Sequence, residues 1–316
     1  MKYSISIKLS ELGYSPYIIG PFYKKYNYDI SFIKNYTNLI IVKDFSEIKR
    51  NDYDILMVNS DQIWKKKYPE YFYDSAFLCF SRNWKILKFV YGASLGYIEW
   101  KFNKTDEKIA KECLKSFQGI SVREIGAVER IQNHLGFKPT FVLDPTFLID
   151  EKYYFNLINK YKVQNFIHEK FLFTYLFGEE KEIVKFIEES SSSLNYKIFR
   201  VKTSHTNSVM KFLYGIYYCK AVITNSYHAT VFSIIFNKPF VTFIYKNRSN
   251  DRFDSLSRIF NIGNRIFYYN NKPNISLLTT PLNIEQNKIK ILKYKSIHFI
   301  KKNLNLYKKL FNHKYL

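Results

Sequence analysis

The stretch Ala221–Phe236, A-V-I-T-N-S-Y-H-A-T-V-F-S-I-I-F, indicates the fold of this chain. Its first four residues are apolar or β-branched and predict a buried strand, and residues 228–236 predict a buried helix. Open α/β sheets bind ligands between such a strand and helix, where unpaired backbone N–H groups attract anions. We therefore expect His228, with Asn225 and Ser226 beside it, at the centre of an active site. The alternative is that His228 only packs against the start of the helix.

The same order of strand, polar residues and helix repeats on both sides of this stretch. Apolar runs predict strands at 54–58, 86–91, 119–122, 140–143, 171–177, 197–201, 221–224 and 240–245. Helical patterns fall between them, at 105–117, up to Leu135, and at 151–170, 179–190 and 208–218, while the run Ser190–Ser193 predicts a loop. Strands that alternate with helices are typical of parallel α/β sheets. We expect two such domains, residues 1–150 and 151–285.

The start of the chain departs from this pattern. Residues 5–12 carry apolar residues at helical spacing and end at Gly13, a natural helix end, before a short strand at 17–19. An α/β domain normally begins with a strand. The sequence therefore predicts a first domain that opens inside a helix.

The end of the chain is strongly basic. Residues 285–316 contain nine lysines and one acidic residue. Roughly one helical face carries Ile289, Leu292, Ile300, Leu304 and Leu310 or Phe311. We expect a helix at 286–312 that packs back on the first domain. The alternative is a basic amphipathic surface for anionic lipid.

Composition limits the classes of partner. The 316 residues are 47% hydrophobic, and 49 Lys and Arg against 27 Asp and Glu give a net charge of +22. This balance favours phosphorylated metabolites, an acidic membrane surface or nucleic acid. No helix-turn-helix, RRM-like or zinc pattern accompanies the lysines, so we expect no nucleic-acid partner.

Cysteine and histidine usage argues against metal and disulfide chemistry. Cys79, Cys113 and Cys219 each stand alone at no metal-ligand spacing, and the six histidines are scattered. The sequence predicts no metal site and no disulfide framework. It carries no secretory signal and no apolar run of membrane-spanning length, which predicts a cytoplasmic, soluble protein.

Several short motifs stand in a set order along the chain. They are N-S-D-Q-I-W at 59–64, Y-G-A-S-L-G at 91–96, S-V-R-E at 121–124, L-D-P-T at 143–146, N-S-Y-H-A-T-V-F at 225–232, N-K-P-F at 237–240, R-F-D-S-L at 252–256 and K-S-I-H-F-I-K-K-N-L at 295–304. In this order they resemble the polysaccharide pyruvyl transferase family. The resemblance implies a GT-B-like fold of two Rossmann-like domains facing across a cleft. It also implies transfer of a pyruvyl group from phosphoenolpyruvate onto two hydroxyls of one sugar, as a cyclic ketal.

The sequence departs from the family pattern in three places. Asn59 and Ala229 stand where the family usually has glycine. Family members also generally begin with a strand and an N-Y-G loop, which this sequence does not show. We therefore expect the N-terminal domain to lack its first strand, with an exposed sheet edge as the consequence.

Phosphoenolpyruvate carries a carboxylate and a phosphate, so its site needs fixed cations and hydrogen-bond donors, and no metal or cofactor is required. Arg252 and Arg123 are the candidate cations, each with an ion pair as the alternative: Asp251 or Asp254 for the first, Glu124 or Glu129 for the second. Lys246 and Arg248 are weaker candidates. Hydrogen bonds would come from Asn225, Ser226, Ser94 and Ser60. Trp64 would stack on a sugar, with burial in the core as its alternative.

Acid and base roles fall to two residues from different domains. His228 fits a general acid, because a bound dianion favours its protonated form. Asp61 would be the base or would orient the hydroxyls of a sugar or lipid-linked oligosaccharide acceptor, and its alternative is a cap on a helix that starts near Gln62. Asp144-Pro145 reads mainly as a rigid turn. A nucleotide-sugar glycosyltransferase, a non-catalytic glycan-binding relative and peripheral association with an anionic membrane remain alternatives.

Overall fold

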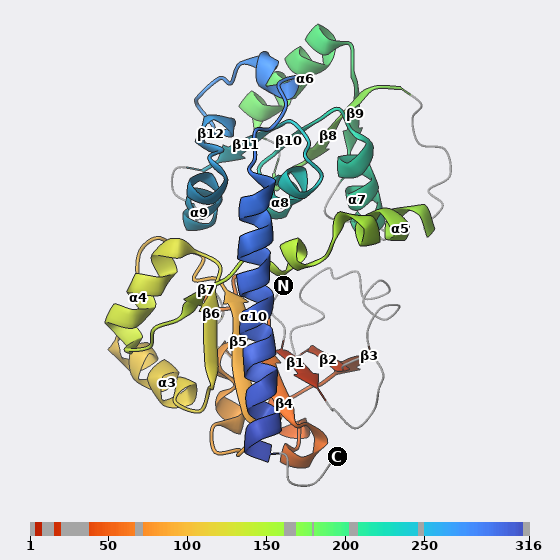
Figure 1. The fold of residues 1–316 in the computed structure, drawn as a ribbon. Helices are drawn as coiled ribbons and strands as arrows, with labels where there is room; N and C mark the ends of the chain where they lie inside the picture. The colour runs from red at the N-terminus through yellow and green to blue at the C-terminus, as the bar shows by residue number, and fades with distance from the viewer. Residues whose placement is uncertain are drawn as a thin grey trace. The chain divides into compact units, whose positions relative to one another are not determined.

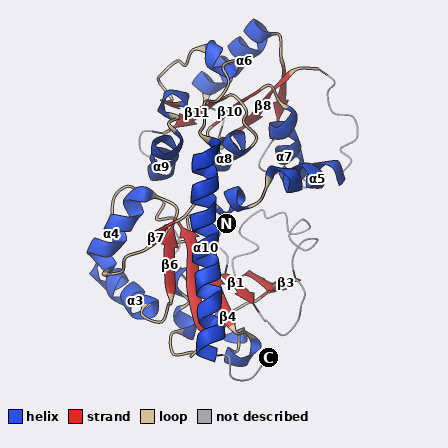
Figure 2. Cartoon of the chain, viewed as in Figure 1, coloured by secondary structure: helices blue, strands red, loops and turns tan. Residues whose placement is uncertain are grey.

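The computed structural model describes residues 4–7, 16–19, 38–66, 72–160, 169–178, 180–201, 208–245 and 250–311. The chain forms two compact units, Met1–Leu148 with Asn287–Leu316, and Ile149–Gln286. Each unit is a β-sheet with helices packed against it (Figures 1 and 2). No helix in the described ranges is both long and apolar enough to cross a bilayer.

The first unit is built on a mostly parallel sheet. Its strands lie in the order β3 (Asn38–Ile41), β2 (Pro16–Ile19), β1 (Ser4–Ile7), β4 (Ile55–Val58), β5 (Leu87–Ala93), β6 (Gly119–Val122) and β7 (Thr140–Phe141). Strands β4 to β7 are mutually parallel, whereas β1 is antiparallel to both of its neighbours. The carboxyl ends of β4 to β7 therefore meet at one edge.

The prediction for the start of the chain is wrong where it can be checked. Residues 5–7 belong to strand β1 rather than to a helix, and the rest of the predicted helix lies outside the described residues. All four residues of β1 pair with β4, from Ser4 with Val58 to Ile7 with Ile55. Sheet pairing outweighs the local helical spacing. Because β1 also pairs with β2, strand β4 is not an exposed edge of this sheet.

Helices cover both faces of this sheet. On one face lie α2 (Phe72–Phe77), α3 (Lys104–Leu114) and α4 (Ile125–Leu135), which bury Ala110, Leu114 and Ile131 against strand residues such as Val58 and Val90. Helix α3 begins at a capping box formed by Asn103 and Asp106. This cap fixes where the chain turns back after β5.

Helix α10 (Gln286–Phe311) covers the other face of the same sheet and crosses β5 in Figure 1. The Phe299 ring lies 6.4 Å from the Phe89 ring and 6.3 Å from the Tyr91 ring. The buried backbone N–H of Leu143 donates to Ser296 Oγ at 2.9 Å. The last segment of the chain thus completes the core of the first unit.

The second unit has a fully parallel sheet in the order β12 (Ile266–Tyr268), β11 (Phe240–Ile244), β10 (Ala221–Thr224), β8 (Phe171–Tyr175) and β9 (Lys197–Arg200). Its helices are α5 (Glu151–Lys160), α6 (Lys181–Leu194), α7 (Ser208–Tyr218), α8 (Tyr227–Ile235) and α9 (Asp251–Phe260). Short 3₁₀ turns in the two units are η2 (Phe45–Glu47), η3 (Arg50–Asp52), η4 (Cys79–Ser81), η5 (Pro145–Leu148), η6 (Gly263–Arg265) and η7 (Ile275–Leu278). Strand β10, the stretch from which the fold was predicted, lies at the centre of this sheet.

The predicted loop at Ser190–Ser193 is wrong, because these serines continue helix α6. The helix packs Ile183, Ile187 and Leu194 on the sheet, and Ser190 is buried in the same row. It ends at Asn195, whose φ of 52° is the left-handed conformation common at helix ends. Tertiary packing therefore outweighs the weak helix preference of serine.

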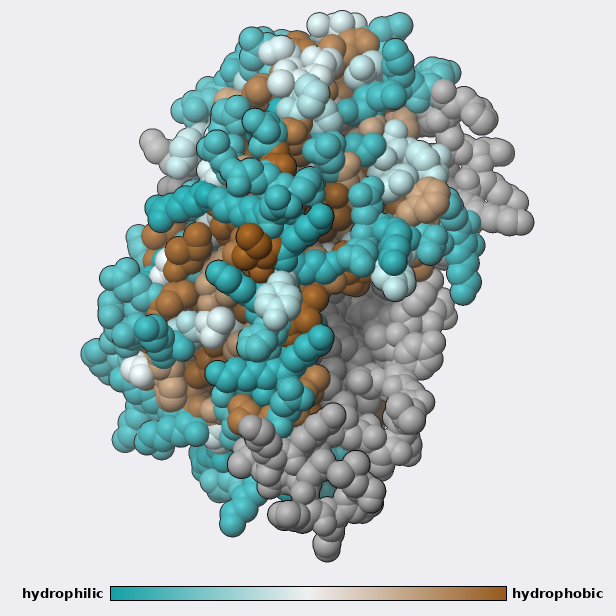
Figure 3. Space-filling view, viewed as in Figure 1, coloured by the Kyte–Doolittle hydropathy of each residue, from teal (hydrophilic) through white to brown (hydrophobic). Residues whose placement is uncertain are grey.

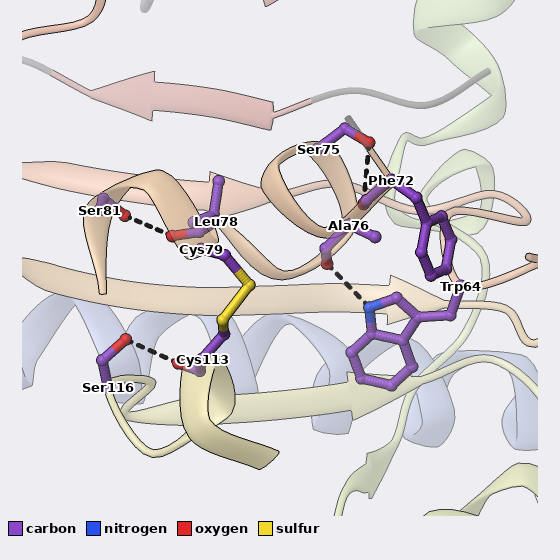
Figure 4. The surroundings of a disulfide bond; sticks show 9 residues. All are labelled: Trp64, Phe72, Ser75, Ala76, Leu78, Cys79, Ser81, Cys113 and Ser116. Atoms are coloured by element: carbon purple, nitrogen blue, oxygen red, sulfur yellow. Dashed lines mark hydrogen bonds between the residues drawn. A yellow bond between two sulfur atoms is a disulfide. The ribbon is translucent and has the colours of Figure 1, made fainter. Parts of the chain in front are cut away.

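The structure also corrects the expectation that the cysteines have no disulfide partner. Cys79 in η4 and Cys113 in α3 are joined by a disulfide bond, although they lie 34 residues apart in the sequence (Figure 4). Both elements pack in the same hydrophobic core, which brings the two side chains together. Cys219 is a buried free thiol.

Candidate active site

In the first unit, a polar cluster forms where β4 and β5 end. Asp61 pairs with Ala93 in an isolated parallel bridge, and the backbone N–H of Ser94 donates to the carbonyl of Asp61 at 2.9 Å. Asp61 has a φ of 88°, a conformation that is costly for a residue with a side chain. Such strain persists only where the surrounding structure enforces it, and it is often found at functional sites.

Arg123 follows β6 directly and joins the ends of three strands. Its Nη2 donates to Asp61 Oδ1 at 2.8 Å, and its Nη1 donates to Asp144 Oδ2 at 2.5 Å. Glu124 Oε1 lies 3.8 Å from Arg123 Nε. Of the predicted pairs, the one with Glu124 is therefore present, but the closer partners are the two aspartates.

Burial separates the roles within this cluster. The side chains of Arg123 and Asp144 are each 1% exposed, whereas that of Asp61 is 20% exposed. A buried guanidinium that is paired with carboxylates cannot also bind a ligand from solution without breaking those pairs. The geometry therefore makes Arg123 a residue that orients Asp61, and it leaves Asp61 as the group that a ligand can reach.

The alternative prediction for Asp61, that it caps a helix starting near Gln62, is wrong. Residues 62–65 form a turn, with the N–H of Lys65 donating to the carbonyl of Gln62, and α2 begins at Phe72. No helix starts at Gln62. The Asp61 carboxylate pairs with Arg123 instead.

The prediction that Trp64 stacks on a sugar is wrong. Trp64 is 1% exposed, and its Nε1 donates to the Ala76 carbonyl at 2.9 Å (Figure 4). Its ring stacks on Phe77. A ring enclosed in this way has no face for a sugar. Its alternative, burial in the core, is what the structure shows.

The two serines of this cluster are buried as well. Ser60 Oγ donates to the carbonyl of Gly92 at 2.9 Å, and Gly92 has a φ of 61° that suits glycine. Ser94 is fully buried, and its hydroxyl has no hydrogen-bond partner among the described residues. Ser60 thus joins the segment after β4 to the end of β5, and the Ser94 hydroxyl is buried beside this segment.

In the second unit, Asn225 follows the central strand β10 and holds a neighbouring loop. Its Oδ1 accepts from the Phe177 N–H at 2.7 Å, while its Nδ2 donates to the Phe177 carbonyl and to the Tyr269 hydroxyl, each at 3.2 Å. Burial, together with a hydrogen bond to Tyr245, raises the pKa of Tyr269, so that its hydroxyl stays protonated. Asn225 therefore fixes the loop after β8 rather than facing solvent.

Helix α8 begins directly after this asparagine. Ser226 is its cap, with Oγ accepting from the N–H of Ala229 at 3.4 Å, and it is 1% exposed. His228 lies in the first turn and is partly exposed. It therefore stands where the helix dipole favours a bound anion.

Arg252 lies in the first turn of helix α9, not in a loop. Its guanidinium carbon stands 5.0 Å from the centre of the Tyr227 ring, and the imidazole of His228 packs edge-on to the same ring at 5.4 Å. The structure thus brings the predicted acid and the predicted cation around one tyrosine. The weaker candidates Lys246 and Arg248 lie outside the described residues.

Two contributors to these clusters were not assigned a role from the sequence. Asp144, which we interpret from the sequence mainly as part of a rigid turn, binds Arg123. Like Asp61, it follows a predicted strand, and that position was the signal in the sequence that could have identified it. Tyr227 lies between the predicted strand and the predicted helix, and only the fold shows that it packs against Arg252. In the described part of the chain, no group of three or more His, Cys, Asp or Glu side chains is placed to hold a metal ion.

Two units with helices on their sheets, each with polar side chains at the carboxyl edge of its parallel strands, define a GT-B-like α/β protein of two Rossmann-like domains. The family model for polysaccharide pyruvyl transferase matches residues 3–247, well over half of the chain, and the chain belongs to this family. A comparison with curated proteins gives no match.

Proposed function

We propose that this transferase moves a pyruvyl group from phosphoenolpyruvate onto two hydroxyls of one sugar in a cell-surface polysaccharide or its lipid-linked precursor. The observation that carries the proposal is the cluster of His228 and Arg252 around Tyr227 at the start of α8, in a chain of this family. A partly exposed imidazole and guanidinium beside a helix amino terminus suit a small dianion. Phosphoenolpyruvate is a cytoplasmic metabolite, which favours that compartment.

The reaction needs one acid and one base. His228 gives its proton to the methylene carbon of phosphoenolpyruvate, and the resulting oxocarbenium-like carbon is attacked by the first sugar hydroxyl, whose proton passes to a base. The C–O bond to phosphate then breaks, the second hydroxyl attacks the cationic carbon, and its proton passes to the released phosphate. Proton exchange with solvent restores the base and His228. The products are the cyclic ketal and inorganic phosphate, so atoms and charges balance without a redox partner.

The residues divide into those that touch substrate and those that hold them in place. Arg252 and the N–H groups at the start of α8 bind the donor's phosphate or carboxylate. Asp61 is the base or orients the acceptor hydroxyls, and Arg123 holds its carboxylate. Asn225, Ser226 and Ser60 maintain the backbone of the two strand edges.

The test is phosphate release from phosphoenolpyruvate in the presence of galactosyl, glucosyl or mannosyl acceptors. We expect His228→Ala to lower kcat at least about a hundredfold with an unchanged circular dichroism spectrum. The matched control is His134→Ala, a histidine of the first unit that stacks on Trp100, and it should retain activity.

Two outcomes would contradict the proposal. Binding of a nucleotide sugar with no binding of phosphoenolpyruvate would indicate a glycosyltransferase. Binding of a glycan with no turnover of either donor, in the unmodified protein, would indicate a non-catalytic relative.

A further inference from the structure

A basic pocket lies at the opposite end of strands β6 and β7 from the Arg123 cluster. It is a pocket of about 510 Å³ between α10 and the amino-terminal ends of β6 and β7. The carboxyl ends of these strands carry the Arg123 cluster. The pocket is therefore not part of that cluster.

The rim of this pocket is cationic. Lys138, Lys295, Lys302 and His298 line it, and all four are exposed. None of the four forms an ion pair with any residue that the structure describes, and the pocket lining contains no carboxylate. Like charges gathered without a counter-charge attract an anionic partner.

The floor of the pocket is mainly apolar, with one unsatisfied polar group. Ile120, Phe141 and the buried Phe299 contribute the apolar part. Asn303 is 2% exposed, and its Nδ2 donates to the Phe299 carbonyl at 2.8 Å. Its Oδ1 accepts no hydrogen bond from any described residue. This oxygen is enclosed against Gly119, so the pocket offers a ligand its apolar floor and its cationic rim.

Helix α10 also presents apolar side chains to solvent beside this rim. Ile291 is 55% exposed and Tyr294 is 70% exposed, and Tyr294 lines the pocket. Residues 291, 295, 298 and 302 are three or four apart, so they form one stripe along the helix. In Figure 3, drawn from the side along which α10 runs, hydrophobic residues are exposed among hydrophilic ones on the first unit. Lysines around exposed aromatic and aliphatic side chains are typical of surfaces that lie on a lipid interface.

We propose that this face of α10 docks on an anionic membrane, with the phosphate headgroup of a lipid in the pocket. The lysines bind the phosphate, and Ile291 and Tyr294 enter the interfacial layer. Phosphatidylglycerol supplies the anionic phosphate. This assignment does not depend on the transferase reaction.

The test is cosedimentation of the full chain with vesicles of phosphatidylcholine alone or mixed with phosphatidylglycerol. We expect binding only to the anionic vesicles, and a loss of affinity of about a hundredfold in the triple variant Lys138→Glu/Lys295→Glu/Lys302→Glu. The control variant Lys160→Glu/Lys181→Glu/Lys211→Glu changes three exposed lysines of the second unit and alters net charge equally. It should bind nearly as well as the unmodified protein.

A second variant separates lipid from soluble phosphate. Ile291→Ser/Tyr294→Ser should weaken vesicle binding several-fold, and glycerol phosphate in solution should compete only weakly. Equal losses in the two lysine variants would show that overall charge alone is responsible. Absence of vesicle binding, or equal affinity for glycerol phosphate and vesicles, would overturn the membrane assignment.

Discussion

Arg123 shows how one residue can join several strands of a sheet. It lies between Asp61, Asp144 and Glu124, which come from the ends of β4, β7 and β6. The planar guanidinium offers donors in several directions, which an ammonium group cannot match. The pairing with buried Arg123 holds the partly exposed Asp61 carboxylate in a fixed orientation.

Replacement of Arg123 by methionine should therefore destabilise the first unit. The carboxylates around it would lose their buried counter-charge, and we expect the free energy of unfolding to fall by about 3–5 kcal/mol in urea titrations. Arg123→Lys should recover only part of this loss. Arg258→Met, an exposed arginine on α9, should change stability by no more than about 0.5 kcal/mol. Unchanged stability in Arg123→Met would mean that the buried pairs make no net contribution.

At the scale of elements, the disulfide joins two segments that the sequence kept apart. Cys79 lies in η4 and Cys113 near the end of α3, and both belong to the core beneath β4 and β5 (Figure 4). Isolated cysteines in a chain of this length gave no pairing signal, because only the fold shows which side chains are adjacent. The cross-link restricts the unfolded chain between the two elements.

The double variant Cys79→Ser/Cys113→Ser should lower the free energy of unfolding by about 3–4 kcal/mol, as expected for a closed loop of this length. Thiol titration of the denatured, unreduced protein should find one free thiol out of three cysteines. A reducing agent should lower the stability of the natural sequence and leave the double variant unchanged. Three titratable thiols in the purified protein would contradict this prediction.

At the scale of the whole molecule, the first unit is discontinuous in sequence. Residues 287–316 belong to it, and Phe299 and Ser296 of α10 fill one face of its sheet. The second unit, by contrast, is one continuous segment with its own sheet and core. The two should differ in their ability to fold alone.

We expect residues 149–286 to fold cooperatively as a separate protein, with a single thermal transition followed by circular dichroism. Residues 1–148 should not, because the loss of α10 exposes Phe89 and Tyr91 and leaves the Leu143 N–H without its partner. Addition of residues 287–316 through a flexible linker should restore folding. A stable 1–148 fragment would show that α10 is dispensable for this core.

The sequence by itself determined the elements whose patterning is local. Strand β10, helix α8 and the polar residues between them follow from a β-branched run next to a buried helical pattern. Most of the family motifs were readable for the same reason, since they lie at strand ends, whereas the motifs at 252–256 and 295–304 lie in helices α9 and α10. Asp61, His228 and Arg252 could thus be named as candidates before any contact was known.

Only the tertiary structure decided what depends on distant neighbours. Strand β1 forms because β4 offers it a pairing edge, and the four serines of α6 are helical because that helix packs on the sheet. Trp64 lies in the hydrophobic core and does not stack on a sugar, because Ala76 and Phe77 enclose it. The buried pairing of Arg123 and the cationic pocket beside α10 join segments far apart in the chain. Such contacts arise from long-range packing, which local spacing does not encode.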